Sequence, residues 1–187
     1  SSIDPSGGVF YPEYFRKNFI FNDLTQEGAL IGLRVEGPVN SVDHRITKLC
    51  KELDIMNNEF SILEQEQSNI FWEKTRKLQV FTSLQGNLLR VVVPVSETFE
   101  VIQKLKKHEI NYFLDWGGSL IWLQIDEINT KILREIKEIV QKAAGYLTVI
   151  KIEEDMKATI DIFTVDPIKY KISEKIKTSF DPKRILN

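Results

Sequence analysis

Cysteine and histidine are scarce in this 187-residue sequence, which has one cysteine, Cys50, and two histidines, His44 and His108. A single thiol excludes an internal disulfide, and three such residues cannot supply the four His or Cys ligands of a typical structural zinc site. The chain also lacks an apolar run of transmembrane length and the basic-then-apolar pattern of a signal peptide. These absences predict a metal-free protein of the cytoplasm.

The sequence also lacks an excess of charge of either sign. It has 25 basic and 27 acidic residues, a net charge of −2, so nothing favours a nucleic acid or an anionic membrane as partner. Neither a glycine-rich phosphate loop nor a G-x-S-x-G nucleophile motif occurs. The chain opens with SSIDPSGG and no methionine, so we expect a piece of a longer protein.

The most informative stretch is NYFLDWGGSLIWLQI, residues 111–125. It predicts two strands joined by a two-residue turn at Gly117-Gly118, because glycine accepts the positive φ that such turns need. Both faces of the two strands are largely apolar, so we expect the hairpin at the centre of a sheet with helices on at least one face. Asp115 is the one ionisable residue of the stretch and falls at the turn end.

The second half of the chain shows a regular order of elements. A strand at residues 88–95 precedes a helix capped by Ser96, with Phe99, Ile102 and Leu105 facing the core. After the hairpin, Asn129 caps a helix over residues 130–144, which a glycine at the C′ position ends, and a strand follows at residues 146–152. Strand, helix, strand, strand, helix, strand is the ferredoxin-like order.

The first half repeats part of that order, without its leading strand and helix. We expect an edge strand at residues 9–14, a strand at 29–37, a helix capped by Asn40 or Ser41, and a strand at 60–65. A helix over residues 69–78 closes this half. The predicted fold class is therefore α+β, with duplicated ferredoxin-like (βαββαβ) units whose antiparallel sheets are covered by helices.

The predicted boundaries make residues 1–187 one domain, with the repeated units at about 1–86 and 87–165. The second unit is followed by one more strand at residues 158–165, and then by a helix and tail over 166–187. Pro167 opens this last helix. We expect an apolar stripe of the helix to face the core: Ile168, Ile172, Ile176 and Phe180.

Few side chains are candidates for chemistry. We interpret His44, off the apolar face of its helix, as a surface residue, and His108 as a cation that complements a helix C-terminus. Cys50 falls on an apolar helix stripe and is expected to be an inert, packed thiol. Trp116 and Trp122 on adjacent strands predict either a packed aromatic pair or a wall on which a ligand stacks.

Two arginines stand inside apolar strands, Arg34 and Arg90. A guanidinium there needs an anionic partner such as Asp115, an outlet to water, or a substrate carboxylate that it can clamp with two parallel hydrogen bonds. The sequence leaves the ion-pair or surface interpretation and the ligand interpretation open.

Several stretches resemble a known family. The tail at residues 173–187, SEKIKTSFDPKRILN, is similar to the closing F-D-P-x-x-I-L-N motif of FAD-linked oxidases of the vanillyl-alcohol oxidase class. LRVEG at 33–37, LLRVVVP at 88–94 and DWGG…IWL at 115–123 resemble one branch, the FAD-binding E subunit of bacterial glycolate oxidase, in the order that this branch shows. The resemblance covers nearly the whole chain.

The resemblance implies a C-terminal cap domain, built from duplicated ferredoxin-like units, that closes over FAD bound mainly by a preceding domain. The whole protein would be a flavin-dependent oxidoreductase acting on a small 2-hydroxy acid such as glycolate, with partner subunits that include an iron–sulfur protein. This piece alone is expected to be inactive. The His-rich metal motif of the related D subunit is missing, which argues against a metal. A cytoplasmic location is implied, with peripheral attachment at the inner membrane through partner subunits as the alternative.

The resemblance also suggests roles for particular residues. Arg90 and Arg34 would orient the substrate carboxylate, with Asp115 beside them in the pocket wall. Trp116 and Trp122 would exclude water. The tail around Asp181 and Asn187 would fold toward the FAD. Two other readings stay open: a non-catalytic tandem ferredoxin-like module for binding or assembly, and a purely structural subunit.

Overall fold

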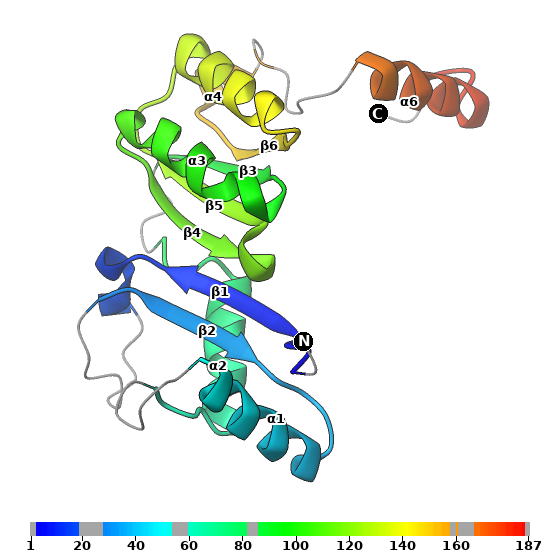
Figure 1. The fold of residues 1–187 in the computed structure, drawn as a ribbon. Coiled ribbons are helices and arrows are strands. Elements are labelled where there is room, and N and C mark those ends of the chain that lie inside the picture. Colours follow the sequence, from blue (N-terminus) through cyan, green and yellow to red (C-terminus); the bar gives the residue numbers. More distant parts are fainter. Residues whose placement is uncertain are drawn as a thin grey trace.

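The protein is an α+β fold built on one six-stranded antiparallel sheet (Figure 1). The computed structural model describes residues 3–18, 28–53, 60–81, 86–157, 160 and 167–185. The strand order is β2-β1-β4-β5-β3-β6. The strands are β1 (Gly7–Tyr11), β2 (Leu30–Arg34), β3 (Asn87–Val92), β4 (Asn111–Asp115), β5 (Leu120–Ile125) and β6 (Tyr146–Lys151).

Helices lie on both faces of this sheet (Figure 1). The α-helices are α1 (Val39–Glu52), α2 (Gln65–Arg76), α3 (Val95–Leu105), α4 (Thr130–Lys142), α5 (Glu154–Lys157) and α6 (Pro167–Phe180). Three 3-10 turns complete the described elements: η1 (Glu13–Asn18), η2 (Lys106–His108) and η3 (Trp116–Gly118).

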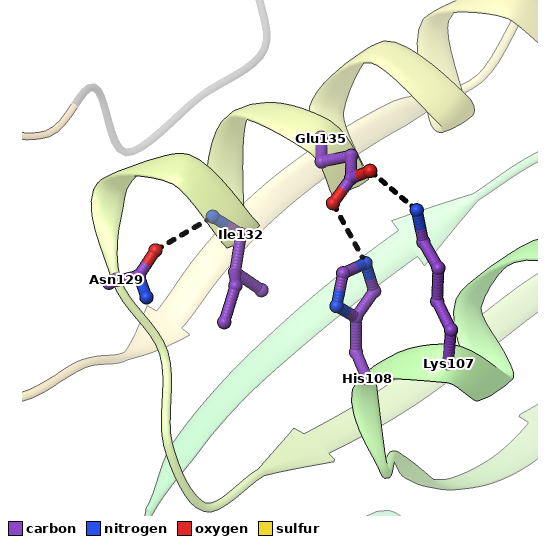
Figure 2. A network of polar contacts seen from close by, with 5 residues as sticks. All are labelled: Lys107, His108, Asn129, Ile132 and Glu135. Carbon is purple, nitrogen blue, oxygen red and sulfur yellow. Dashed lines mark hydrogen bonds and ion pairs between the residues drawn. The ribbon is translucent and has the colours of Figure 1, made fainter.

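The second half has the predicted order, β3-α3-β4-β5-α4-β6, and β4 and β5 lie at the centre of the sheet as expected. Alternate residues of the strands point to α3 and α4, because successive side chains of a strand point to opposite faces. Leu89, Leu123 and Ile136 are fully buried in this front core. The predicted cap of α4 is also confirmed: the Asn129 Oδ1 atom accepts a hydrogen bond from the Ile132 amide at 2.9 Å (Figure 2).

The turn between β4 and β5 is longer than the sequence indicated. Asp115 and Leu120 form the last cross-strand pair, so four residues, 116–119, make the connection instead of two. Trp116 itself adopts a positive φ of 52°, as do both glycines after it, and therefore leaves the strand. The Asp115 Oδ1 atom accepts a hydrogen bond from the Trp116 amide at 2.7 Å, and Thr98 of α3 donates one to the Gly118 carbonyl at 2.7 Å.

The first half departs further from the prediction. β1 is no edge strand, since it lies between β2 and β4 and ends before Pro12. Residues 60–64 form no regular structure, so the strand predicted at 60–65 is wrong, and α2 begins at Gln65. Pro38, rather than Asn40 or Ser41, precedes the first residue of α1. Proline supplies the required φ there without a side-chain cap.

A second core lies on the opposite face of the sheet, under α2. Tyr11 and Phe113 stack with ring centroids 5.0 Å apart, and Phe71 of α2 meets Tyr11 edge-on at 6.2 Å. The Tyr11 hydroxyl donates a 2.7 Å hydrogen bond to Thr75 of α2. This back core covers β1 and β4 and extends to Leu88 at one end of β3.

The C-terminal helix exists as predicted, but its apolar stripe does not face a core. Ile168, Ile172, Ile176 and Phe180 are all exposed, and Figure 1 shows α6 standing apart from the sheet. The strand predicted at residues 158–165 lies outside the described residues, apart from Ile160. Phe99 of α3, predicted to face inward, is 73% exposed, whereas Ile102 and Leu105 are buried as predicted, together with Val101.

Gly145 has a different role from the predicted one. The left-handed residue after α4 is Ala144, with φ 51°. A Cβ atom on Gly145 would lie 2.4 Å from Val93 Cγ1 and 2.6 Å from the Val92 carbonyl oxygen. Gly145 is therefore required because β3 passes so close to it.

No helix in the described ranges has the length and apolar character needed to cross a membrane. Nor do three His, Cys, Asp or Glu side chains of the same ranges gather as ligands for a metal ion.

Candidate functional site

The face of β3, β5 and β6 that points away from α3 and α4 carries the main predicted site residues. Arg90 of β3 lies between Trp122 of β5 and Thr148 of β6 in the strand register. Tyr146 and Ile150 on β6 point to the same face and are about half exposed. α2 covers the neighbouring strands β1 and β4, which leaves this part of the sheet open in the described structure.

The Arg90 guanidinium rests on the Trp116 ring, with its carbon 4.8 Å from the ring centroid. Trp116 is 56% exposed, so the pair stands at the surface. Within the described residues, Arg90 makes no ion pair or hydrogen bond with another side chain or carbonyl. A guanidinium stacked on an aromatic ring keeps its edge free for a carboxylate, because the ring occupies only its flat side.

Asp115 does not supply the anionic partner that Arg90 could have had. Its carboxylate is partly buried beside the turn and holds the Trp116 amide. Burial raises the pKa of Asp115, and the hydrogen bond from Trp116 partly offsets that rise. Asp115 thus fixes the start of the turn that presents Trp116, which makes it a positioning residue for the Arg90–Trp116 pair.

The two predicted tryptophans do not form a pair across the hairpin. Because Trp116 has left the strand, its ring lies over Arg90, and no ring contact joins it to Trp122 in the described structure. Trp122 instead packs toward the back core, nearly parallel to Phe113 at 25° and 6.5 Å. Arg90 lies next to both tryptophans. It is the cross-strand partner of Trp122, and its guanidinium stacks on the Trp116 ring.

Arg34 is not part of this site. It forms a 2.9 Å ion pair with Glu36, and its guanidinium lies 6.0 Å from the Trp72 ring of α2. The ion-pair interpretation that the sequence left open is the arrangement found. Arg34 is on β2 and Arg90 on β3, four strand spacings apart, or roughly 19 Å. One small hydroxy acid cannot reach both.

The predicted cofactor residues lie elsewhere. Asp181 is buried just after α6, and its Oδ1 atom accepts a 2.9 Å hydrogen bond from the Ile185 amide, which folds the tail into a tight turn. Arg184 in that turn forms a 3.2 Å ion pair with Glu174 of α6. Asn187 lies outside the described residues. An ionised carboxylate accepts hydrogen bonds and repels an anion, so Asp181 itself does not suit the phosphates of FAD.

His108 is more buried than its sequence position suggested. Its side chain is 9% exposed, and its Nε2 atom lies 3.3 Å from Glu135 of α4, which Lys107 also contacts (Figure 2). Burial lowers the pKa of His108, while Glu135 raises it and Lys107 lowers it. The imidazole therefore packs between η2 and α4, where its buried Nε2 atom makes no hydrogen bond with a described residue, and Lys107 is the residue that bonds to Glu135.

The remaining two candidates, His44 and Cys50, both lie on α1. His44 is exposed on α1, as predicted. Cys50, on the apolar side of the same helix, is half-buried rather than fully packed.

Thr148, Tyr146 and Thr98 were missed from sequence. Thr148 and Tyr146 share the face of Arg90, and Thr98 fixes the turn that carries Trp116. The alternation of YLTVIK already places Tyr146, Thr148 and Ile150 on one face, so that signal was available. No local signal marks Thr98, because its partner is twenty residues away.

Comparison with known proteins was made for the whole chain. No protein-family model matches it, and a search of curated proteins gave no match. A function must therefore be argued from the fold and from the open face of the sheet.

Proposed function

We propose that this chain is the cap domain of an FAD-dependent oxidoreductase for a small 2-hydroxy acid, similar to the E subunit of bacterial glycolate oxidase. In this proposal the two halves of the sheet are duplicated ferredoxin-like units, the first of them incomplete. The open face of β3, β5 and β6 would form one wall of the substrate pocket. The flavin would be held mainly by another domain, and partner subunits, including an iron–sulfur protein, would carry electrons away.

The observation that carries the proposal is the Arg90–Trp116 pair. Two of the stretches that resemble the family, at residues 88–94 and 115–123, meet there through these side chains. A guanidinium that meets no carboxylate among the described residues, held on an exposed ring at a sheet face that no described helix covers, suits the recognition of a carboxylate. A purely structural arginine would be expected to find a carboxylate within the fold, as Arg34 does with Glu36.

The residues of this chain would then have distinct roles. Arg90 would hold the substrate carboxylate, and Trp116 would keep the guanidinium in place and shield the pocket from water. Thr148 offers a hydroxyl one strand away from Arg90. Bound FAD would supply the electron acceptor for the oxidation. The carboxylate of Asp181 is held by its own turn, so in this proposal the FAD phosphates are bound mainly by donors of the other domain.

A second candidate function rests on a different observation. The apolar stripe of α6 is exposed along its whole length, and its four members share one side of the helix. Exposed apolar surface of this kind is typical of contact with another domain or protein. A non-catalytic module for assembly would use α6 and leave Arg90 without a substrate.

The experiment uses the intact gene product, purified from its source cells, so that any domain outside this chain is present. We expect a flavin absorption spectrum and dye reduction that depends on glycolate. Arg90→Ala should raise the KM for glycolate tenfold or more, or abolish turnover. Arg90→Lys should recover only part of the activity, because an ammonium cannot form two parallel hydrogen bonds.

Arg134→Ala is the matched control, since Arg134 is an exposed arginine on α4, on the other face of the sheet. It should leave the kinetics unchanged. Unchanged kinetics for Arg90→Ala would reject the assignment of Arg90. An intact product that binds no flavin but elutes in a stable complex would reject the oxidoreductase and favour the assembly module.

A further inference from the structure

Charge is distributed unevenly along the chain. Residues 170–185, which comprise most of α6 and the turn after it, include five of the 25 basic residues but only two of the 27 acidic ones. The rest of the chain therefore has 20 basic and 25 acidic residues. The small net charge of the whole sequence thus combines a basic segment with an acidic body.

Both acidic side chains of this basic segment are engaged within it. Asp181 is buried and accepts the 2.9 Å hydrogen bond from the Ile185 amide, and Glu174 pairs with Arg184 at 3.2 Å. The lysines of the segment are exposed and form no ion pair with another described residue: Lys171, Lys175, Lys177 and Lys183. The outward charge of the segment is therefore positive.

The same segment presents an apolar stripe to solvent. Ile172 and Ile176 are each 53% exposed, and Phe180 is 85% exposed. Their four-residue spacing places them on one side of α6. Lys175 and Lys177, the sequence neighbours of Ile176, point about 100° to either side of it. Lysine can lay its methylene stem along an apolar surface and keep its ammonium group outside, so these two side chains suit the borders of a buried stripe.

The turn after α6 adds one more apolar side chain. The Asp181 amide donates a 2.7 Å hydrogen bond to the Lys177 carbonyl, and the Asp181 carboxylate fixes the turn that follows. Ile185 lies at the end of this turn and is 75% exposed. The exposed apolar surface therefore extends past the end of the helix, still within the basic segment.

The length and position of α6 suit binding along a surface. Its 14 residues make a helix about 21 Å long, shorter than the hydrocarbon core of a bilayer, which is about 30 Å thick. Figure 1 shows α6 apart from the sheet, so its stripe can approach a flat surface while the acidic body stays away. An anionic lipid surface offers acyl chains and negative headgroups everywhere, whereas a protein partner would need an apolar groove with acidic rims on both sides.

We propose that α6 and the turn after it bind an anionic lipid surface directly. The helix lies in the plane of the surface, with Ile172, Ile176 and Phe180 at the level of the acyl chains and the lysines among the headgroup phosphates. The same headgroups repel the acidic body, so the sheet is held away from the lipid. This attachment requires neither a partner subunit nor flavin, and it does not rest on the proposed function.

Flotation of the intact gene product with lipid vesicles is the first test. We expect the protein to float with vesicles of phosphatidylcholine and phosphatidylglycerol in equal parts, and to stay unbound with vesicles of phosphatidylcholine alone. Raised salt should weaken the binding, because it screens the lysines from the headgroups. Absence of binding, or equal binding to both kinds of vesicle, would overturn the proposal.

Substitutions in the stripe test its insertion. Ile172→Gln combined with Ile176→Gln should weaken binding to the mixed vesicles at least tenfold, because the stripe can no longer enter the acyl region. Ile62→Gln combined with Ile150→Gln changes two exposed isoleucines outside α6 and is the matched control. The control should bind as the parent does, and equal binding by the two double variants would reject the stripe as the site of contact.

Substitution of the lysines tests the electrostatic part. Each lysine near an anionic surface contributes about fivefold to binding, so loss of three should weaken it roughly a hundredfold. The test variant combines Lys171→Gln, Lys175→Gln and Lys177→Gln. The matched control removes three exposed lysines elsewhere, by Lys131→Gln, Lys142→Gln and Lys151→Gln. Equal losses in the two triple variants would indicate attraction by overall charge and reject α6 as the binding site.

Thiol labelling shows whether protein covers the stripe instead. In a Cys50→Ala background, Ile176→Cys should react readily with a maleimide in the absence of vesicles, and at least tenfold more slowly with the mixed vesicles. Protection without vesicles would overturn the proposal in favour of a protein contact, and protection that rises with protein concentration would identify a second copy. None of these readouts needs flavin, so a failed oxidase assay with intact vesicle binding would reject the proposed function only.

Discussion

The hydroxyl of Tyr14 donates a 3.1 Å hydrogen bond to the carbonyl of Tyr112 and accepts a 2.9 Å hydrogen bond from the amide of the same residue. β1 and β4 share only one registered pair, Phe10 with Leu114, before β1 ends at Tyr11. The phenol therefore satisfies a donor and an acceptor of β4 that a longer β1 would have satisfied. The side chain of Tyr14 thus adds two hydrogen bonds to the junction between the two halves of the sheet, beside the stacked rings of Tyr11 and Phe113.

Tyr14→Phe should weaken that junction. The substitution keeps the ring and removes both hydrogen bonds, each worth about 0.5–1.5 kcal/mol, so we expect a loss of about 1–2 kcal/mol in the free energy of unfolding. Tyr14 is 48% exposed, so water can replace part of the loss. Urea denaturation measures the loss in the free energy of unfolding. Tyr170→Phe, at an exposed site on α6, is the control, and equal stabilities of the two variants would contradict the bridging role.

The same contact predicts loss of stability in alkali. Partial burial raises the pKa of Tyr14 to about 12, although the hydrogen bonding to Tyr112 lowers it. The folded chain thus keeps a proton that the unfolded chain releases near pH 10, so this contribution is complete below pH 10 and is lost as the pH rises toward 12. Tyr14→Phe should show a shallower fall in stability above pH 10 than the parent, and parallel pH profiles would argue against it.

Gly145 and Ala144 should respond in opposite directions to substitution. Gly145→Ala places a methyl group within 2.6 Å of β3, and we expect a loss of about 1–3 kcal/mol from overpacking. Ala144→Gly relieves a left-handed backbone with φ 51° and should stabilise the protein by up to about 1 kcal/mol. Thermal unfolding of the two variants checks both signs. A stable Gly145→Ala protein would mean that β3 can move away from the turn.

The sequence predicted elements whose signals are local. The Asn129 cap, the central hairpin and the order of the second half follow from periodicity and capping within a few residues, and the structure confirms them. The strand at residues 60–65 was predicted with the same kind of signal and is wrong. A strand needs a partner, and local pattern does not say whether the partner is present.

The candidate site could be predicted only in part. The sequence placed Arg90 inside an apolar strand, and the register adds that Trp122 on the neighbouring strand is its partner. It placed Trp116 on a strand next to that of Trp122, but the longer turn takes Trp116 out of the strand and brings its ring over Arg90. Contacts such as Tyr14 with Tyr112 join residues 98 positions apart, and a single sequence carries no signal for them.

His108 should make stability fall in mild acid. Burial lowers its pKa below the ordinary 6.5, against the attraction of Glu135. Between the lowered pKa of the folded chain and the ordinary 6.5 of the unfolded chain, the unfolded chain binds more protons than the folded one. The free energy of unfolding therefore decreases as the pH falls through 6.5 and recovers as the pH rises again. His108→Gln should flatten the change between pH 8 and pH 5.5 in urea denaturation. His44→Gln, at an exposed site, should leave the profile unaltered.

A comparison of Arg90 with Arg45 separates a functional role from a structural one. Arg45 donates to the carbonyls of Ile3, Asp4 and Glu36, so Arg45→Ala should cost about 2–4 kcal/mol of the free energy of unfolding. The guanidinium of Arg90 makes no hydrogen bond to a described residue and stacks on an exposed ring, a contact worth about 0.5–1 kcal/mol, so Arg90→Ala should cost about that much.

Urea denaturation of both variants decides between these expectations. A loss for Arg90→Ala as large as that for Arg45→Ala would show that the fold itself requires the guanidinium, and any kinetic defect of that variant would then be structural. A small loss, together with a raised KM for glycolate in the intact protein, would support ligand binding as the role of the Arg90 guanidinium. Stability therefore has to be measured before the kinetics of Arg90→Ala can be interpreted.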